Sequence, residues 1–165
     1  MSRKTEKNSL ESLDNTDIQI LKILQEDSSL TTKEIAAMVN LSPTPVFERI
    51  KRLQKSGYIK KYTAILDAEK LSQGFIVFCN IRLKQHSKEL GNEFMDAILG
   101  IEEITECYNI SGEYDFMLKI HMQSMPYYQD FVLNTLGEID AIGNLQSLFV
   151  MGEIKHSYAI PLSGR

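Results

Sequence analysis

Tryptophan is absent from this chain of 165 residues, which also has only two cysteines and three histidines. Cys79 and Cys107 lie far apart and form no CxxC or Cys/His pattern, so we interpret both as thiols of the hydrophobic core. His86, His121 and His156 stand in three separate segments. The sequence therefore offers no candidate metal site, and we predict no cofactor.

Motifs of enzymes are also missing. The chain has no HxxxH motif, no nucleophile elbow and no P-loop. Glu102 and Glu103 are neighbouring carboxylates in a turn region, where such pairs are usually hydrated. We predict that the protein is not an enzyme.

No run of 18 apolar residues, the length needed to cross a bilayer as a helix, occurs in the chain. The N-terminal residues MSRKTEKNSLES lack the apolar segment of a secretory signal and show no periodicity. We predict a soluble, cytoplasmic protein without a membrane partner, in which residues 1–12 form a disordered tail.

Charge is distributed unevenly. Residues 1–66 contain 11 basic and 8 acidic residues, a net charge of +3, whereas residues 67–165 contain 7 and 14, a net charge of -7. Basic residues concentrate in residues 41–62, LSPTPVFERIKRLQKSGYIKKY, which contain six of them and a single acid, Glu48. This local reversal of sign in a chain of net charge -4 indicates two modules, one of which has a polyanionic partner.

Three helices are predicted in residues 13–66. Asp14 is a candidate N-cap for the first, Thr31 and Glu34 form a capping box for the second, and Ser42 followed by proline begins the third. Asn40, which tolerates left-handed backbone, separates the last two. We expect a winged-helix-like helix-turn-helix domain whose basic third helix enters the DNA major groove. Charge alone would also fit an amphipathic helix with a hydrated basic face.

Period-two alternation begins after the polar linker, residues 67–74. We predict helices at 88–99 and 126–136 and strands at 58–66, 75–83, 103–110, 114–122 and 145–156. From residue 75 to residue 162 the order is βαββαβ, the ferredoxin-like arrangement, so the fold class is α+β. Two helices cover only one face of such a sheet. Because apolar side chains also occupy the second face, we expect another subunit to cover it.

The turn that joins the two middle strands, SGEYD, contains Gly112 and Asp115. Backbone N–H groups at a glycine can bind a carboxylate, and an aspartate can bind an ammonium group, so this turn can bind a zwitterion. A plain hairpin turn explains the same residues.

The chain resembles the Lrp/AsnC, or feast/famine, family of transcription regulators from Leu13 to Leu162. The resemblance is carried by LDNTDIQIL, LSPTPVFERIKRL, GYIKKYTAIL, SGEYDFML and FVMGEIKH in this order and spacing. It implies sequence-specific regulation of transcription through binding of double-stranded DNA, a homodimer that assembles into an octamer, and an amino-acid effector bound between dimers.

Transferred by motif, the predicted DNA-binding residues are Ser42, Thr44, Pro45, Glu48, Arg49 and Arg52, to which the basic face adds Lys51. The effector-binding residues implied by the resemblance are Gly112, Asp115, Met125, Ser147 and Leu148. The apolar residues among them favour leucine or methionine as the effector. The alternative hypothesis is a metabolite-binding oligomeric module that does not bind specific DNA sequences.

Overall fold

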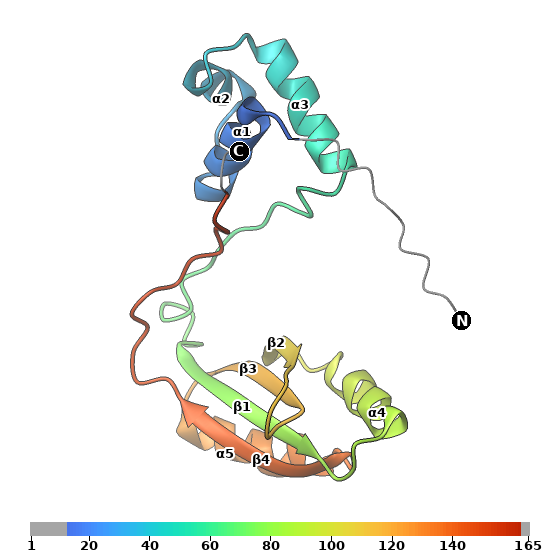
Figure 1. Cartoon of the computed structure of the whole chain (residues 1–165). Coiled ribbons are helices and arrows are strands. Elements are labelled where there is room, and N and C mark those ends of the chain that lie inside the picture. The colour runs from blue at the N-terminus through green and yellow to red at the C-terminus, as the bar shows by residue number, and fades with distance from the viewer. Residues whose placement is uncertain (1–12, 163–165) are drawn as a thin grey trace, which may run out of the picture. The chain divides into compact units, whose positions relative to one another are not determined.

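The computed structural model describes residues 13–162 and divides the chain into two compact units (Figure 1). The helical unit comprises residues 13–64 and 155–162, and the sheet unit comprises residues 65–154. The disordered tail that we expect at residues 1–12 lies outside the described residues. Among the described residues, no helix is long and apolar enough to cross a membrane.

The helical unit contains the predicted helix-turn-helix. Its helices are α1 (Asn15–Glu26), α2 (Thr32–Met38) and α3 (Pro43–Lys55). Ile20, Ile35, Val46 and Leu53 are at most 1% exposed and form the centre of its core. Asn40 has a φ of 55°, so the left-handed residue between α2 and α3 is confirmed.

Local side chains fix where the first two helices begin. The Asp14 carboxylate accepts the backbone N–H of Asp17 at 2.8 Å, and Thr31 accepts that of Glu34 at 3.3 Å. In both cases the second side chain accepts the N–H of the first residue, so both ends are complete capping boxes. These contacts satisfy N–H groups that a helix cannot pair internally.

A buried carboxylate joins α1 to α3. Asp17 is 1% exposed, and its two oxygens accept hydrogen bonds from Arg49 at 2.7 Å and Arg52 at 2.5 Å. Arg49 also reaches Asp14 at 2.6 Å. Because a buried charge is tolerated only when it is paired, Asp17 fixes the position of α3 against α1.

The strand that we predict at residues 58–66 is wrong. The chain leaves α3 through Gly57, whose φ is 77°, and then runs without regular secondary structure to residue 67. A strand requires a hydrogen-bonded neighbour, and no strand among the described residues pairs with this segment. Its β-branched and aromatic residues therefore do not suffice to form one.

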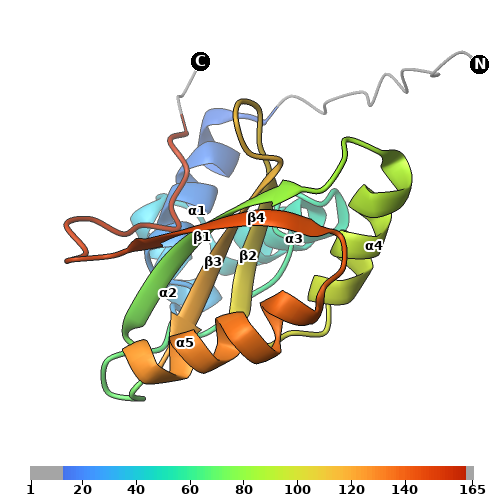
Figure 2. The ribbon, with the colours of Figure 1, turned by 90° about the horizontal axis from the view of Figure 1, so that it is seen from below.

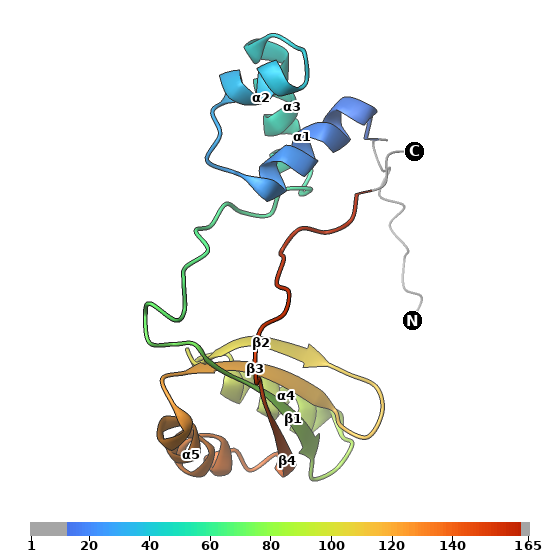
Figure 3. The ribbon, with the colours of Figure 1, turned by 90° about the vertical axis from the view of Figure 1, so that its left-hand side faces the viewer.

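The sheet unit has the predicted βαββαβ order. Its elements are β1 (Phe75–Leu83), α4 (Lys88–Ile98), β2 (Ile104–Asn109), β3 (Phe116–Met122), α5 (Met125–Asn134), a short 3-10 turn (Leu136–Glu138) and β4 (Ile142–Phe149). The strands lie in the order β2-β3-β1-β4, all antiparallel (Figure 2). Figure 3 shows α4 and α5 on the same face of this sheet.

The core lies between the sheet and these two helices. Alternate residues of β1, from Val77 to Leu83, are at most 7% exposed, and the rings of Phe94 and Phe116 are 4.7 Å apart. Cys79 is a core thiol as predicted, and its burial raises its pKa to about 11. The same prediction for Cys107 is wrong, because Cys107 lies on the edge strand β2 and is exposed.

The last strand ends earlier than we predict, at Phe149 instead of His156. Phe149 pairs with Val77, and β1 begins only two residues before Val77, so beyond the bond from the Val150 N–H to the Ile76 carbonyl β1 cannot pair with a strand that continues to His156. The chain then continues without regular structure. In the helical unit, the backbone N–H and carbonyl of Ile160 bond to the side chain of Gln25 at 3.2 and 3.0 Å.

Replacing the central carboxylate tests its role. We expect Asp17→Ala to lower the free energy of unfolding of the helical unit by about 2–3 kcal/mol, because two arginines lose a buried partner. The matched control Asp14→Ala removes an exposed cap and should cost about 1 kcal/mol. Chemical denaturation followed by circular dichroism measures both. Equal losses in the two variants would contradict the central role of Asp17.

Candidate nucleic-acid interface and effector site

Helix α3 has a buried side and an exposed side. Val46 and Leu53 are 0% and 1% exposed and face the core of the helical unit. At 100° per residue, the positions opposite to them are Thr44, Glu48, Lys51 and Lys55, and Phe47 borders these four at about 100° from Val46. All five are exposed. We call these five residues the outer stripe.

Two prolines shape the start of α3. Ser42 is the N-cap, but its side chain makes no capping hydrogen bond. Pro43 and Pro45 occupy the first and third helical positions, so the third position has no N–H for the serine hydroxyl to accept. The Ser42 hydroxyl and the Thr44 N–H therefore remain as the polar groups of this first turn. A helix start with two prolines therefore offers fewer N–H groups to a phosphate than one without them.

The two arginines of α3 lie beside the outer stripe and not on it. Asp17 holds both, and the side chains of Arg49 and Arg52 are 28% and 47% exposed. The backbone N–H of Asp17, and then Arg49, lower the pKa of Asp14 below its ordinary value, which favours the ionised form of this carboxylate. Arg52 combines a fixed position with an exposed guanidinium. Its contact with DNA, like that of the other six predicted residues, stays a prediction.

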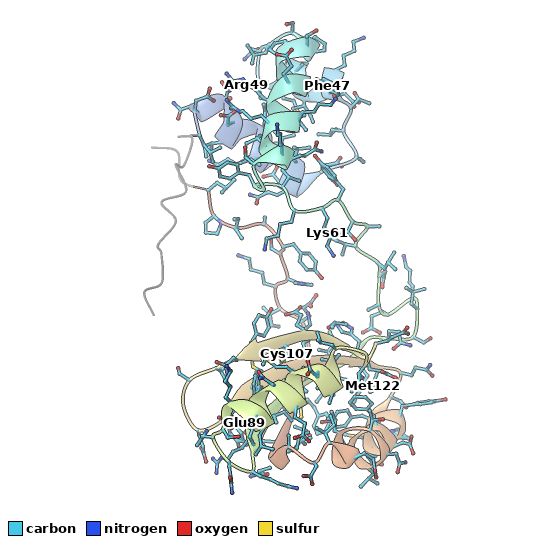
Figure 4. The ribbon with its side chains drawn as sticks, turned by 90° about the vertical axis from the view of Figure 1, so that its right-hand side faces the viewer. Phe47, Arg49, Lys61, Glu89, Cys107 and Met122 are labelled. Atoms are coloured by element: carbon cyan, nitrogen blue, oxygen red, sulfur yellow. The ribbon has the colours of Figure 1, made fainter. Side chains whose placement is uncertain are left out.

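Sequence reasoning missed Phe47. Its side chain is 48% exposed on the outer stripe, and the Lys51 ammonium lies 4.5 Å from the centre of its ring. Figure 4 shows Phe47 and Arg49 on different sides of α3. The available signal was the helical spacing, because Phe47 follows Thr44 by three residues and precedes Lys51 by four.

The predicted effector turn is held by Arg82 of β1. The Arg82 side chain donates to the Glu113 carbonyl at 2.9 Å and to the Glu113 carboxylate at 2.7 Å. The guanidinium also lies 5.3 Å from the ring centre of Tyr114. Gly112 has a φ of 121°, a conformation that favours glycine. Arg82 thus contacts both the backbone and the side chains of this turn.

Asp115 has two partners of different kinds. One carboxylate oxygen accepts the backbone N–H of Leu83 at 2.8 Å, where a bulge interrupts the pairing of β1 with β4. The other lies 2.8 Å from Nδ1 of His86. Asp115 is 16% exposed and His86 is 81% exposed. The His86 contact can be lost without breaking the sheet, whereas the Leu83 contact cannot. We call the carboxylate oxygen that faces His86 the exchangeable oxygen.

The five predicted effector residues do not meet within one chain. Gly112 and Asp115 precede β3 and Met125 follows it, and the seven residues of β3 span roughly 20 Å. Ser147 faces α5, where the Tyr128 hydroxyl lies 2.6 Å from its Oγ. Burial raises the pKa of Tyr128, so this hydroxyl stays protonated. Leu148 is the next residue of β4 and points to the opposite face of the sheet.

No three His, Cys, Asp or Glu side chains of residues 13–162 are grouped so that they could hold a metal ion. A helix with basic residues at its side can bind a polyanion, and a turn with an aspartate can bind a cation.

Two family profiles match the chain. "Winged helix-turn-helix DNA-binding" matches residues 13–60, and "Lrp/AsnC ligand binding domain" matches residues 76–160. The leucine-responsive regulatory proteins of Escherichia coli K12 and Klebsiella pneumoniae are 34% identical over 153 residues, which is 93% of this chain and 93% of theirs.

Solved structures agree with these matches. A transcriptional regulator of Neisseria meningitidis in complex with L-Met superimposes with a TM-score of 0.88 and 34% identity, covering 91% of this chain and 97% of that chain. An AsnC family regulator of Agrobacterium tumefaciens gives 0.86 and 34%, covering 90% and 97%. The chain therefore belongs to the Lrp/AsnC family of DNA-binding transcription regulators, which are not enzymes, and has a helix-turn-helix domain joined to an Lrp/AsnC ligand-binding domain.

Proposed function

We propose that the protein regulates transcription by binding specific DNA sequences through α3 and that an amino acid controls its assembly or its DNA occupancy. One observation carries the first part. The helix that follows the tight turn at Asn40 is bordered by basic residues, although the chain has a net charge of -4. The proposed binding to DNA also supports a cytoplasmic location.

In this proposal the exposed residues of α3 have two roles, contact with phosphates and contact with bases. Lys55 and Arg52 contact phosphates, which gives affinity without sequence preference. The outer stripe from Thr44 to Lys51 faces base edges in the major groove. The Ser42 hydroxyl, free of a capping bond, is available to a phosphate at the helix start.

The effector in this proposal binds between copies of the chain. Gly112 and Asp115 of one copy bind the carboxylate and ammonium groups of the amino acid, and the ammonium replaces His86 at the exchangeable oxygen. Met125 and Leu148 are 37% and 46% exposed and supply apolar surface from another copy. The L-Met bound to the Neisseria relative supports methionine, and the leucine-responsive relatives support leucine.

Assembly in this proposal begins at the open face of the sheet. The register places Phe78, Met117, Tyr108 and Leu148 on the face that α4 and α5 leave open. Lys119 on this face is 8% exposed and is paired with Glu106 at 3.2 Å. An apolar face whose central charge is already paired can be buried by a second copy. Dimers formed this way then assemble into an octamer.

The alternative, a metabolite-binding oligomer that does not bind specific DNA, is favoured by one observation. Arg49 and Arg52 already have acidic partners within the helical unit, which reduces the positive charge available to phosphates. Binding measurements with DNA distinguish the two functions.

For DNA binding, we expect Arg52→Ala to weaken affinity by about 1 kcal/mol or more and to reduce the slope of log K against log salt by about one. The measurement is fluorescence anisotropy with a labelled duplex enriched by the full-length protein from a random pool. Lys70→Ala, which removes one exposed charge of the linker, is the matched control and should change neither quantity. If the two variants behave alike, α3 is not the DNA contact, and thermal melting verifies that Arg52→Ala remains folded.

For effector binding, we expect L-methionine or L-leucine to raise the melting temperature, because a ligand at 100 times its Kd stabilises the folded state by about 2.7 kcal/mol. Asp115→Asn keeps an oxygen for the Leu83 N–H but loses the charge, so the shift should disappear. Asp140→Asn removes the charge of another sheet-unit carboxylate, which is paired with Lys84, and should retain the shift. A shift that persists in Asp115→Asn argues against this site.

For assembly, we expect Leu148→Glu to reduce the oligomer to smaller species, because it places a charge in the covered sheet face. Leu133 of α5 is 70% exposed, so Leu133→Glu is a matched control that should leave the mass unchanged. Size-exclusion chromatography with light scattering measures both masses. A wild-type monomer at micromolar concentration would rule out the proposed assembly.

A further inference from the structure

We propose that Phe47, held against Lys51, recognises the 5-methyl group of a thymine in the major groove. The inference rests on the proposed DNA binding by α3 and adds the base that the helix reads. It concerns a residue that is not among the seven predicted DNA-binding residues.

The first support is the place of Phe47 on the helix. The ring is 48% exposed, although its neighbour Val46 is fully buried. It stands at the edge of the outer stripe beside Thr44, Glu48 and Lys51, about 100° around the helix from Val46. A large apolar side chain exposed at the edge of a polar face gains by contact with an apolar group of a partner.

The second support is the contact with Lys51. The ammonium lies 4.5 Å from the ring centre, which is within the range of a cation–π interaction. The contact occupies one face of the ring and directs the remaining ammonium hydrogens outward. Phe47 and Lys51 thus present an apolar edge and a set of N–H donors side by side, one helical turn apart.

The chemistry of the major groove matches this pair. The thymine methyl is the apolar group that a base edge exposes there, and phenylalanine is one of the side chains that contact it. A lysine beside it can donate to the O6 and N7 atoms of guanine or to a phosphate. Arg49 lies on another side of α3 and is bound to Asp14 and Asp17, so it does not compete for this position (Figure 4).

The test removes the methyl group from the DNA and the ring from the protein. Duplexes enriched from a random pool by the full-length protein are resynthesised with single thymines replaced by deoxyuridine. We expect at least one position at which this replacement weakens wild-type binding about fourfold, as for one buried methyl group. In Phe47→Ala the same replacement should have no effect, and the affinity for the thymine duplex should be at least fourfold lower.

Two further variants separate this role from others. Phe47→Leu keeps an apolar side chain and should retain part of the thymine preference. Lys55→Ala removes a charge from the same stripe, so it should lower the affinity and the salt slope but leave the ratio between thymine and deoxyuridine unchanged. The inference is overturned if, at every position, the ratio of the affinities for the thymine and deoxyuridine duplexes is the same in wild type and in Phe47→Ala. Failure to enrich any duplex contradicts the proposed function itself.

Discussion

The helical unit depends on one buried carboxylate. Asp17 is 1% exposed and accepts hydrogen bonds from two arginines of α3, while it completes the capping box at the start of α1. A charge so far from water requires these partners, because an unpaired buried carboxylate is strongly destabilising. The position of α3 on α1 is therefore determined by charge as well as by the apolar contacts of Ile20, Val46 and Leu53.

This arrangement decides which residues α3 presents. With its arginines held at the side, the helix exposes Thr44, Glu48 and Lys51 directly away from the core and Phe47 beside them. The sheet unit uses a carboxylate in a similar way. Asp115 binds the backbone of Leu83 where β1 and β4 lose register, and it keeps one oxygen for the exposed His86. In both units an aspartate holds the scaffold beside the surface that is proposed to bind a ligand.

The sequence predicted those helices and strands whose signals lie within the element itself or next to it. The caps at Asp14 and Thr31 were found because a capping box lies within four residues, and β1 was found because its buried positions alternate. The failures have one physical cause. The expected strand at residues 58–66, the extension of β4 to His156 and the burial of Cys107 each required a neighbouring strand or helix, and a propensity cannot supply that neighbour.

Prediction of the candidate sites from the sequence was limited in the same way. The sequence alone determined the helix-turn-helix, the ferredoxin-like order and the family, because these follow from local periodicity, caps and ordered motifs. Only the tertiary structure decided that Arg49 and Arg52 bind Asp17, which precedes them by 32 and 35 residues. It also decided that Gly112 and Asp115 lie apart from Met125, and that Phe47 faces outward beside Lys51. Side-chain partners across such distances depend on how the elements pack, and packing is a property of the folded chain rather than of any segment.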